Sequence, residues 1–189
     1  MQTQTQALSA FLKEKTQDSH DAAEQLMQAD KIFKGTFTFT DYLAMLQINA
    51  KLLQQFEPAV MAAIPDELSN ELHLSAREKL PLLRQDFAEL DLPFPGPILN
   101  AGIPDVHEAL GILYVMEGAT LGGQVIAKQL SKLPEFADHH FYFLKSYGKD
   151  TGPMWLQFKK VLDEKVQPAD FDKVIAGAEK AYSFMLSHS

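Results

Sequence analysis

The sequence contains no cysteine, and this absence removes several kinds of protein at once. Without cysteine the chain cannot form a disulfide, a zinc finger, a cysteine-bound iron–sulfur cluster or a thiolate ligand to heme iron. A cysteine nucleophile is excluded for the same reason. Any bound metal must therefore be held by nitrogen or oxygen atoms, and the six histidines become the first candidates.

Arginine is also scarce, because Arg77 and Arg84 are the only two in 189 residues. Lysine and arginine together number 17 against 25 acidic residues, which gives a formal net charge of −8. Nucleic-acid binding needs a concentrated basic face. The charge balance therefore predicts no nucleic-acid partner and indicates an acidic surface that favours solubility.

Signal sequences and long apolar runs are missing as well. The chain begins Met-Gln-Thr-Gln-Thr-Gln, without the basic and then apolar segments of a signal peptide. No uninterrupted apolar stretch approaches the roughly 18 residues that cross a bilayer. We therefore expect a cytoplasmic protein with no membrane segment, and residues 1–189 have a length that suits a single domain.

Strand patterns are confined to residues 36–40, which read Thr-Phe-Thr-Phe-Thr. An isolated strand of five residues has nothing to pair with, so we expect a loop or the entry of a helix there. Elsewhere apolar residues recur every three or four positions, which predicts an all-α helical bundle. The expected helices are 7–28, 38–63 (with a Thr38–Asp41 capping box), 68–90 (interrupted at Pro81), 105–132, 141–147, 153–165 and 169–186, with a Pro/Gly-rich linker at 92–97.

Common catalytic motifs are absent, including the Walker loop, Gly-x-Ser-x-Gly and the Glu-x-x-His pairs of di-iron bundles. One constellation that remains is Lys13, His20 and Glu24, which helical spacing places along one stripe about 16 Å long. An imidazole beside a carboxylate is typical of a metal-ligating histidine and its orienting partner. A surface ion pair is the alternative. The other histidines are expected to be structural, with the pair His139–His140 the next candidate for a metal contact.

A second constellation is rich in glycine. Gly111, Gly118 and Gly122 fall on one side of a helix, and Gly123 follows. Each interior glycine costs about 1 kcal/mol of helix propensity relative to alanine. Two explanations remain open: a neighbouring helix packs closely against the bare face, or a flat ligand lies against it and the glycines permit a kink. Charged residues in the segment exclude a membrane dimer motif.

These motifs, in this order, resemble the heme oxygenase family, and most closely the bacterial branch found near biliverdin-binding photoreceptors. The first is the run Leu12-Lys-Glu-Lys-Thr-x-x-x-His20-x-x-Ala-Glu24, and the second is Tyr114-Val-Met-Glu-Gly-Ala-Thr-Leu-Gly-Gly-Gln-Val-Ile126. Residues 147–158 and the last helix, with Ala178 and Tyr182, fit the same family. The resemblance covers almost the whole chain.

The resemblance implies that heme is both substrate and prosthetic group, held between a proximal helix and a kinked, glycine-rich distal helix. On the proximal side, His20 would be the axial ligand of iron and a catalytic residue, with Glu24 beside it. Lys13 would contact a heme propionate.

On the distal side, the resemblance assigns Gly118 and Gly122 as catalytic backbone positions, where O₂ bends toward one edge of the ring, and Gly123 as a further heme contact. Tyr114 would contact a propionate, and Tyr182 would line the pocket.

The implied activity is the oxidative cleavage of heme to biliverdin, CO and ferrous iron with O₂ and an external reductant, such as ferredoxin or a reductase. A biliverdin-binding photoreceptor would be a partner downstream. Ala119 departs from the family, which often has Asp or Ser there to hold a proton-delivering water network. Protons would then come through backbone carbonyls, ordered water or the Thr120 hydroxyl. A heme carrier of the same fold, with weak or no turnover, is the alternative. A helical bundle with an unrelated pocket, such as one for a thiamin precursor, is a third possibility.

Overall fold

The computed structural model describes residues 7–96, 102 and 105–188, and these residues form helices and turns with no strand. The all-α prediction is confirmed. Residues 1–6, Pro97 of the expected linker and Pro104 lie outside the described residues. The helices are α1 (Leu8–Lys15), α2 (Gln17–Leu26), α3 (Ala29–Lys34), α4 (Phe39–Ala63), α5 (Asp66–Leu72), α6 (Leu80–Glu89), α7 (Val106–Leu130), α8 (Tyr142–Lys145), α9 (Thr151–Lys165) and α10 (Phe171–Ser187).

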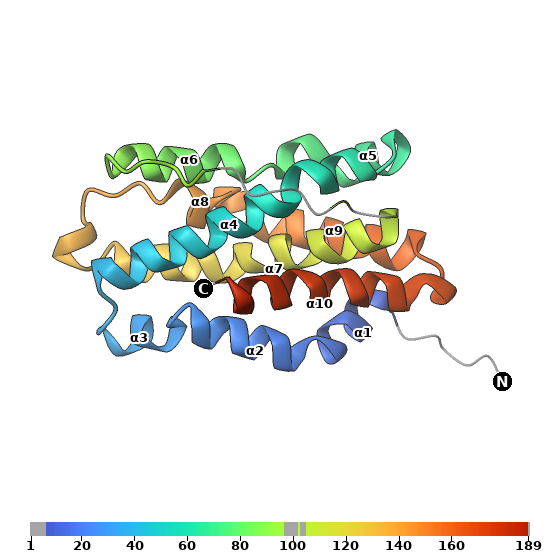
Figure 1. Cartoon of the computed structure of the whole chain (residues 1–189), viewed down its shortest axis with the longest axis horizontal. Helices are drawn as coiled ribbons and strands as arrows, with labels where there is room; N and C mark the ends of the chain where they lie inside the picture. The colour runs from blue at the N-terminus through green and yellow to red at the C-terminus, as the bar shows by residue number, and fades with distance from the viewer. Residues whose placement is uncertain (1–6, 97–101, 103–104, 189) are drawn as a thin grey trace.

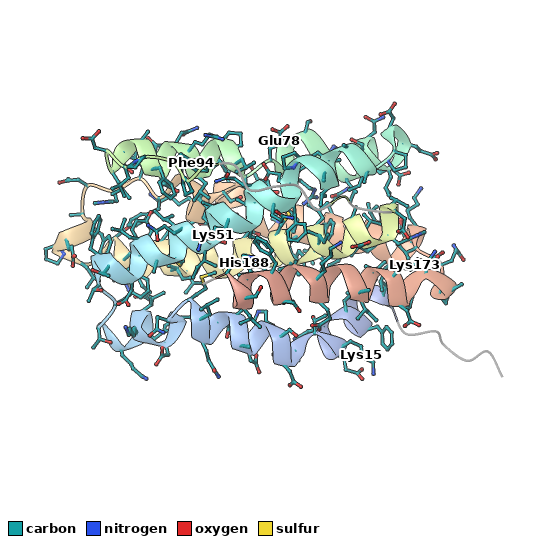
Figure 2. The ribbon with its side chains drawn as sticks, in the orientation of Figure 1. Lys15, Lys51, Glu78, Phe94, Lys173 and His188 are labelled. Carbon is teal, nitrogen blue, oxygen red and sulfur yellow. The ribbon has the colours of Figure 1, made fainter. Side chains whose placement is uncertain are left out.

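The bundle is built around α7, which α4, α8, α9 and α10 all contact. In Figure 1, α1, α2 and α3 form one row along the bottom, α5 and α6 form another at the top, and α7 runs between them. α10 packs along α7 and also contacts α2, so the N-terminal row reaches the centre through α10. Figure 2 shows the side chains that fill the space between these rows.

The start of α4 follows its predicted chemistry. The Thr38 side chain accepts a hydrogen bond from the Asp41 backbone N–H, and the Asp41 carboxylate accepts one from the Thr38 backbone N–H. This reciprocal pair satisfies backbone donors that the first helical turn leaves free. Phe37 and Thr38 precede the helix as a loop and Phe39 begins it, so the expectation of a helix entry rather than a strand is confirmed.

Two predicted helices are broken. The span 7–28 divides at Thr16, whose backbone leaves the helical region (φ −106°, ψ 11°) while its hydroxyl donates to the Leu12 carbonyl oxygen. The separate helix α3 follows Gln28, which adopts a left-handed conformation. The span 68–90 divides at His73, also left-handed, before a short 3₁₀ turn and α6. The prediction of one continuous helix over 7–28 was wrong, because residues 13–21 are all polar and no apolar pattern marks the break. In the span 68–90 the predicted interruption at Pro81 was wrong, since the break falls at His73 and Pro81 lies in the first turn of α6, where proline is tolerated.

The contact between α7 and α10 brings two backbones together at glycines. A Cβ added at Gly111 would lie 1.9 Å from the Val174 carbonyl oxygen, and one added at Gly177 would lie 2.1 Å from the Glu108 carbonyl oxygen. Real Cβ atoms do not come so close to backbone oxygen. Two reciprocal glycines therefore set the distance between the two helices.

Although charged residues interrupt it, α7 is long and apolar enough to cross a membrane by length and composition alone, since its most apolar 18-residue window has a mean hydropathy of 1.3. In the bundle, 61% of the most apolar 18-residue window is buried. Such burial is what a core helix of a bundle shows, since its apolar side chains face other helices.

We predict that Gly177→Ala lowers the free energy of unfolding by about 3 kcal/mol or more, because the added methyl group must push α7 and α10 apart. Urea denaturation followed by circular dichroism measures the change. Gly152→Ala in α9 is the matched control, since its Cβ would meet nothing within 4 Å and alanine favours a helix. Equal stability of the two variants would contradict the close-contact role of Gly177.

Candidate functional site

A cavity of about 810 Å³ lies between the N-terminal helices on one side and α4, α7 and α10 on the other. Its size falls in the range of pockets that enclose small-molecule ligands and cofactors. Most of the wall is apolar, and the side chains responsible include those of Met27, Met45, Leu52, Leu53, Val115, Met116, Ile126, Phe143, Leu144 and Met185. The cavity therefore suits a large ligand that is mainly apolar.

Every site residue predicted from the sequence lines this cavity. α1 and α2 contribute one wall, α7 the facing wall, and α10 a side. The predicted residues in the lining are Lys13, His20, Glu24, Tyr114, Gly118, Gly122, Gly123 and Tyr182. The structure thus brings together residues that lie up to 169 positions apart in the chain.

His20 projects from α2 with a half-exposed side chain. Its Nδ1 is 3.5 Å from Asp21 Oδ1 and its Nε2 is 3.8 Å from Glu24 Oε1, and the latter lies beyond hydrogen-bond distance. The ring meets Tyr182 edge-on, with centroids 6.4 Å apart. Ligand atoms of His20, Asp21 and Glu24 lie within 4.8 Å of one another, so the imidazole sits among groups able to hold a metal. Glu24 does not orient the ring by a direct hydrogen bond.

The glycine spacing in α7 left two explanations open, close packing of a neighbouring helix or contact with a flat ligand. Different glycines fit each of them. Gly111 packs on α10, and a Cβ at Gly123 would lie 2.7 Å from the Leu144 carbonyl oxygen of α8. At Gly122 a Cβ would meet nothing within 4 Å, and at Gly118 only the Trp155 ring at 3.8 Å. Gly111 and Gly123 thus permit close helix packing, whereas Gly118 and Gly122 leave the cavity wall bare.

Two tyrosine hydroxyls lie in the cavity wall. Tyr114 and Tyr182 are each more than nine-tenths buried, and burial raises the pKa of both phenols. They therefore stay protonated at neutral pH and can donate a hydrogen bond. Among the described residues neither hydroxyl has a hydrogen-bond partner, which leaves both able to bind a ligand.

Cations stand at one end of the cavity. Lys13 comes from α1 and Lys159 from α9, two helices that contact each other. Lys159 also lies over the Trp155 ring, with its Nζ 5.6 Å from the ring centroid. Sequence reasoning missed Lys159 and gave Trp155 no role, although their i, i+4 spacing on a predicted helix was a signal for a shared face.

Comparison with known proteins decides the family. The chain is 31% identical over 163 residues to a heme oxygenase of Xanthomonas campestris pv. campestris (strain 8004), covering 84% of this chain and 93% of that protein. This chain belongs to the heme oxygenase family. No family model matches it.

Solved heme oxygenases share the fold. That of Neisseria meningitidis, studied with NO and CO bound, has a TM-score of 0.70 at 23% identity and covers 96% of this chain and 89% of its own. The heme oxygenase of Leptospira interrogans has a TM-score of 0.74 at 15% identity, with 96% and 98% covered. At these identities the likeness supports the fold, and the roles of individual residues rest on the cavity itself.

Ala119, where the family resemblance led us to expect a polar side chain, lines the cavity. The neighbouring Thr120 is buried, and its hydroxyl donates to the Glu117 carbonyl oxygen at 2.7 Å. Thr120 is not among the residues that line the large cavity, so its hydroxyl does not replace the missing side chain of Ala119.

The pair His139–His140 does not form a metal site with the other described residues. The His139 ring packs among aromatic rings, with Phe136 the nearest at 5.6 Å. The His140 backbone N–H and ring Nδ1 both pair with the Glu89 carboxylate. The expectation that these histidines are structural fits these contacts.

A buried charge cluster on α7 was missed by sequence reasoning. Glu117, one residue before Gly118, pairs with Arg77, and its Oε1 is 2.8 Å from Lys79 Nζ. Tyr147 donates a hydrogen bond to the same oxygen at 2.6 Å. The two cations and the carboxylate are each at most 1% exposed, and burial lowers the pKa of Lys79. None of these groups lines the cavity, so the cluster anchors α7 away from the ligand wall.

Glu117→Ala would leave two buried cations without their carboxylate. We predict a loss of about 3–5 kcal/mol in unfolding free energy, which urea denaturation measures. The control is Glu164→Ala on α9, where the exposed carboxylate lies 3.9 Å from Lys160, and there the change should stay below about 0.5 kcal/mol. Similar losses in the two variants would show that the buried cluster does not anchor α7.

Asp86 holds the short helix α8, which places Phe143 and Leu144 in the cavity wall. Its carboxylate accepts hydrogen bonds from the backbone N–H groups of Tyr142 (2.7 Å) and Phe143 (2.8 Å). Burial outweighs these bonds and raises the pKa of Asp86 to about 6. Between pH 4 and 6 the folded protein therefore retains a proton that the unfolded chain has released.

The protonated Asp86 carboxyl makes its full contribution to the free energy of unfolding below pH 4. This contribution, about 3 kcal/mol in total, is lost as the pH rises through 6. We predict that Asp86→Asn removes this component. The unfolding free energy of the wild type minus that of the variant should fall by about 2–3 kcal/mol between pH 4 and 7. Urea titrations across that range test it, and a difference that does not change with pH would show that Asp86 ionises normally.

Proposed function

We propose that this member of the heme oxygenase family cleaves heme oxidatively to biliverdin, CO and ferrous iron, using O₂ and an external reductant. The observation that carries the proposal is the arrangement of His20 and the bare glycines Gly118 and Gly122 around one apolar cavity. A flat tetrapyrrole fits such a space, because a wall without side chains lets a ring lie against the helix backbone.

The residues present fit heme in their chemistry as well. A neutral imidazole is a suitable axial ligand for heme iron, and His20 would supply it. Lys13 and Lys159 at one end would bind the two propionate carboxylates, and Tyr114 and Tyr182 would donate hydrogen bonds from the wall. Glu24 would add negative charge beside the imidazole. Heme itself would supply the redox chemistry, with O₂ as the oxidant.

The protein contributes binding, orientation and exclusion of water. Apolar side chains around the cavity would keep the ring edge dry, while Gly118, Gly122 and Gly123 would let O₂ approach beside the α7 backbone. Ala119 offers no hydrogen bond, so protons would pass through backbone carbonyl groups or ordered water. This position also favours a second candidate function, a heme carrier of the same fold with weak turnover.

The partners follow from the chemistry. Electrons would come from a donor such as ferredoxin or a reductase, and an acidic donor would need a local basic patch on a chain of net charge −8. Biliverdin would pass to a downstream acceptor such as a photoreceptor. We further propose that residues 1–189 form one domain and that the protein acts in the cytoplasm, without a nucleic-acid or membrane partner.

Hemin titration followed by reduction tests the function. The wild-type complex should show a Soret band that decays with ascorbate or a ferredoxin system while biliverdin absorbance grows. In His20→Ala the Soret spectrum should change and biliverdin formation should fall to background, with added imidazole restoring part of the spectrum.

His107→Ala is the matched control for this test, because His107 lies between Asp105 and Asp170 and outside the cavity lining. An unchanged Soret spectrum in His20→Ala would overturn the ligand assignment. Hemin binding without biliverdin under either reductant would favour the carrier.

A further inference from the structure

The helix that carries His20 has little apolar surface with which to hold its place. Residues 13–21 are all polar, and within α2, all of which the structure describes, Ala23 is the one buried residue. In an ordinary amphipathic helix, an apolar face packed on the core sets the rotation and the height of the helix. Polar contacts must therefore do more to position α2 than they do for the core helix α7.

One such contact joins α2 to α10 directly beside His20. The Ser19 hydroxyl donates a hydrogen bond of 2.6 Å to Glu179 Oε2, and the pair is partly buried. A carboxylate acceptor makes this bond stronger than one between two neutral groups. Three residues further along α10, on the same face, Tyr182 meets the His20 ring edge-on. Two successive residues of α2 are thus held by neighbouring side chains of α10.

On its other side, α10 packs against the opposite wall of the cavity. Gly177 makes the close backbone contact with Glu108 of α7, and it precedes Glu179 by two residues, or about 200° around the helix. Gly177 and Glu179 therefore face nearly opposite sides of α10. In Figure 1, α10 runs between α7 and the row of α1 and α2, and it contacts both α7 and α2. The spacing between the helix of His20 and the bare glycine wall is consequently set through α10.

This spacing matters more for a ligand with a central metal than for a metal-free ring. A flat ring can rest on the α7 wall and bind through its faces and its propionates whatever the height of His20. A bond from the imidazole to an iron atom at the centre of that ring forms only when the ligating nitrogen stands at one height above it. Groups that fix a ligating histidine in place therefore tune the affinity for the metal.

We propose that Glu179 is a positioning residue for His20, which acts through its hydrogen bond with Ser19 and holds the imidazole at bonding height above a heme lying on the α7 wall. Neither Ser19 nor Glu179 lines the cavity, so neither touches the ligand. Their effect on heme is exerted through His20. The inference rests on the proposed function and deepens it, because it names what places the axial ligand.

Paired titrations with hemin and with metal-free protoporphyrin IX test the inference without any need for turnover. The two probes share the ring and the propionates, and only hemin can bond to His20. In Glu179→Ala we expect hemin to bind about fivefold more weakly and protoporphyrin IX to bind within about twofold of the wild type. The Soret spectrum of the hemin complex should also shift toward that of His20→Ala.

Further variants separate positioning from folding. Ser19→Ala removes the donor of the same bond and should give the same selective loss, even if Glu179→Ala does not fold. Glu179→Gln keeps an acceptor oxygen and should restore most of the hemin affinity. Ser9→Ala is the matched control, because the Ser9 hydroxyl makes a similar bond of 2.8 Å to Asp163 of α9, away from His20. There the ratio of the two affinities should not change.

Equal weakening of hemin and protoporphyrin IX in Glu179→Ala and Ser19→Ala would make the bond a general structural tie and overturn the inference. Unchanged hemin binding with an unchanged Soret spectrum would overturn it too, while the proposed function stands if the wild type forms biliverdin. A Soret spectrum that His20→Ala leaves unchanged would instead overturn the ligand assignment of the proposed function, and the inference with it.

Discussion

The close approach of α7 to α10 is the constraint on which the rest of the structure depends. Gly111 meets the Val174 carbonyl and Gly177 meets the Glu108 carbonyl, so each helix contributes one glycine to the contact. At the other half of α7, Gly123 meets the backbone of Leu144. Because backbone atoms cannot yield as side chains do, these contacts position α7 from both halves. The open glycines between them therefore have a defined place in the cavity wall.

Polar anchoring adds to this positioning, from side chains that do not line the cavity. Glu117 pairs with Arg77 and Lys79 in a setting that excludes water, where removal of one partner is expensive. The adjacent residue, Gly118, belongs to the cavity wall. On α7, a residue of the buried charge cluster is thus followed directly by a glycine that lines the cavity.

Features set by residues close together in the sequence could be predicted, whereas those set by the packing of distant segments could not. The Thr38–Asp41 capping box predicted the start of α4. Helical spacing placed Lys13, His20 and Glu24 on one stripe of a single helix; the structure puts Lys13 on α1 and the other two on α2, although all three line the cavity. The break at Thr16 escaped prediction because no apolar residue lies between Leu12 and Ala22, so the pattern there marks neither a helix nor its end. The pairing of Arg77 with Glu117, 40 residues apart, follows from the way helices pack and has no local signature.

The cavity has a consequence for the lifetime of the chain. An apolar ligand in the cavity packs against this lining, so such a ligand adds to the core of the bundle. A ligand that binds only the folded state stabilises it in proportion to the logarithm of its concentration. Proteases remove chains that unfold, so a chain of modest stability persists longer when it is loaded. The amount of this protein in a cell would then rise and fall with the supply of the tetrapyrrole that it consumes.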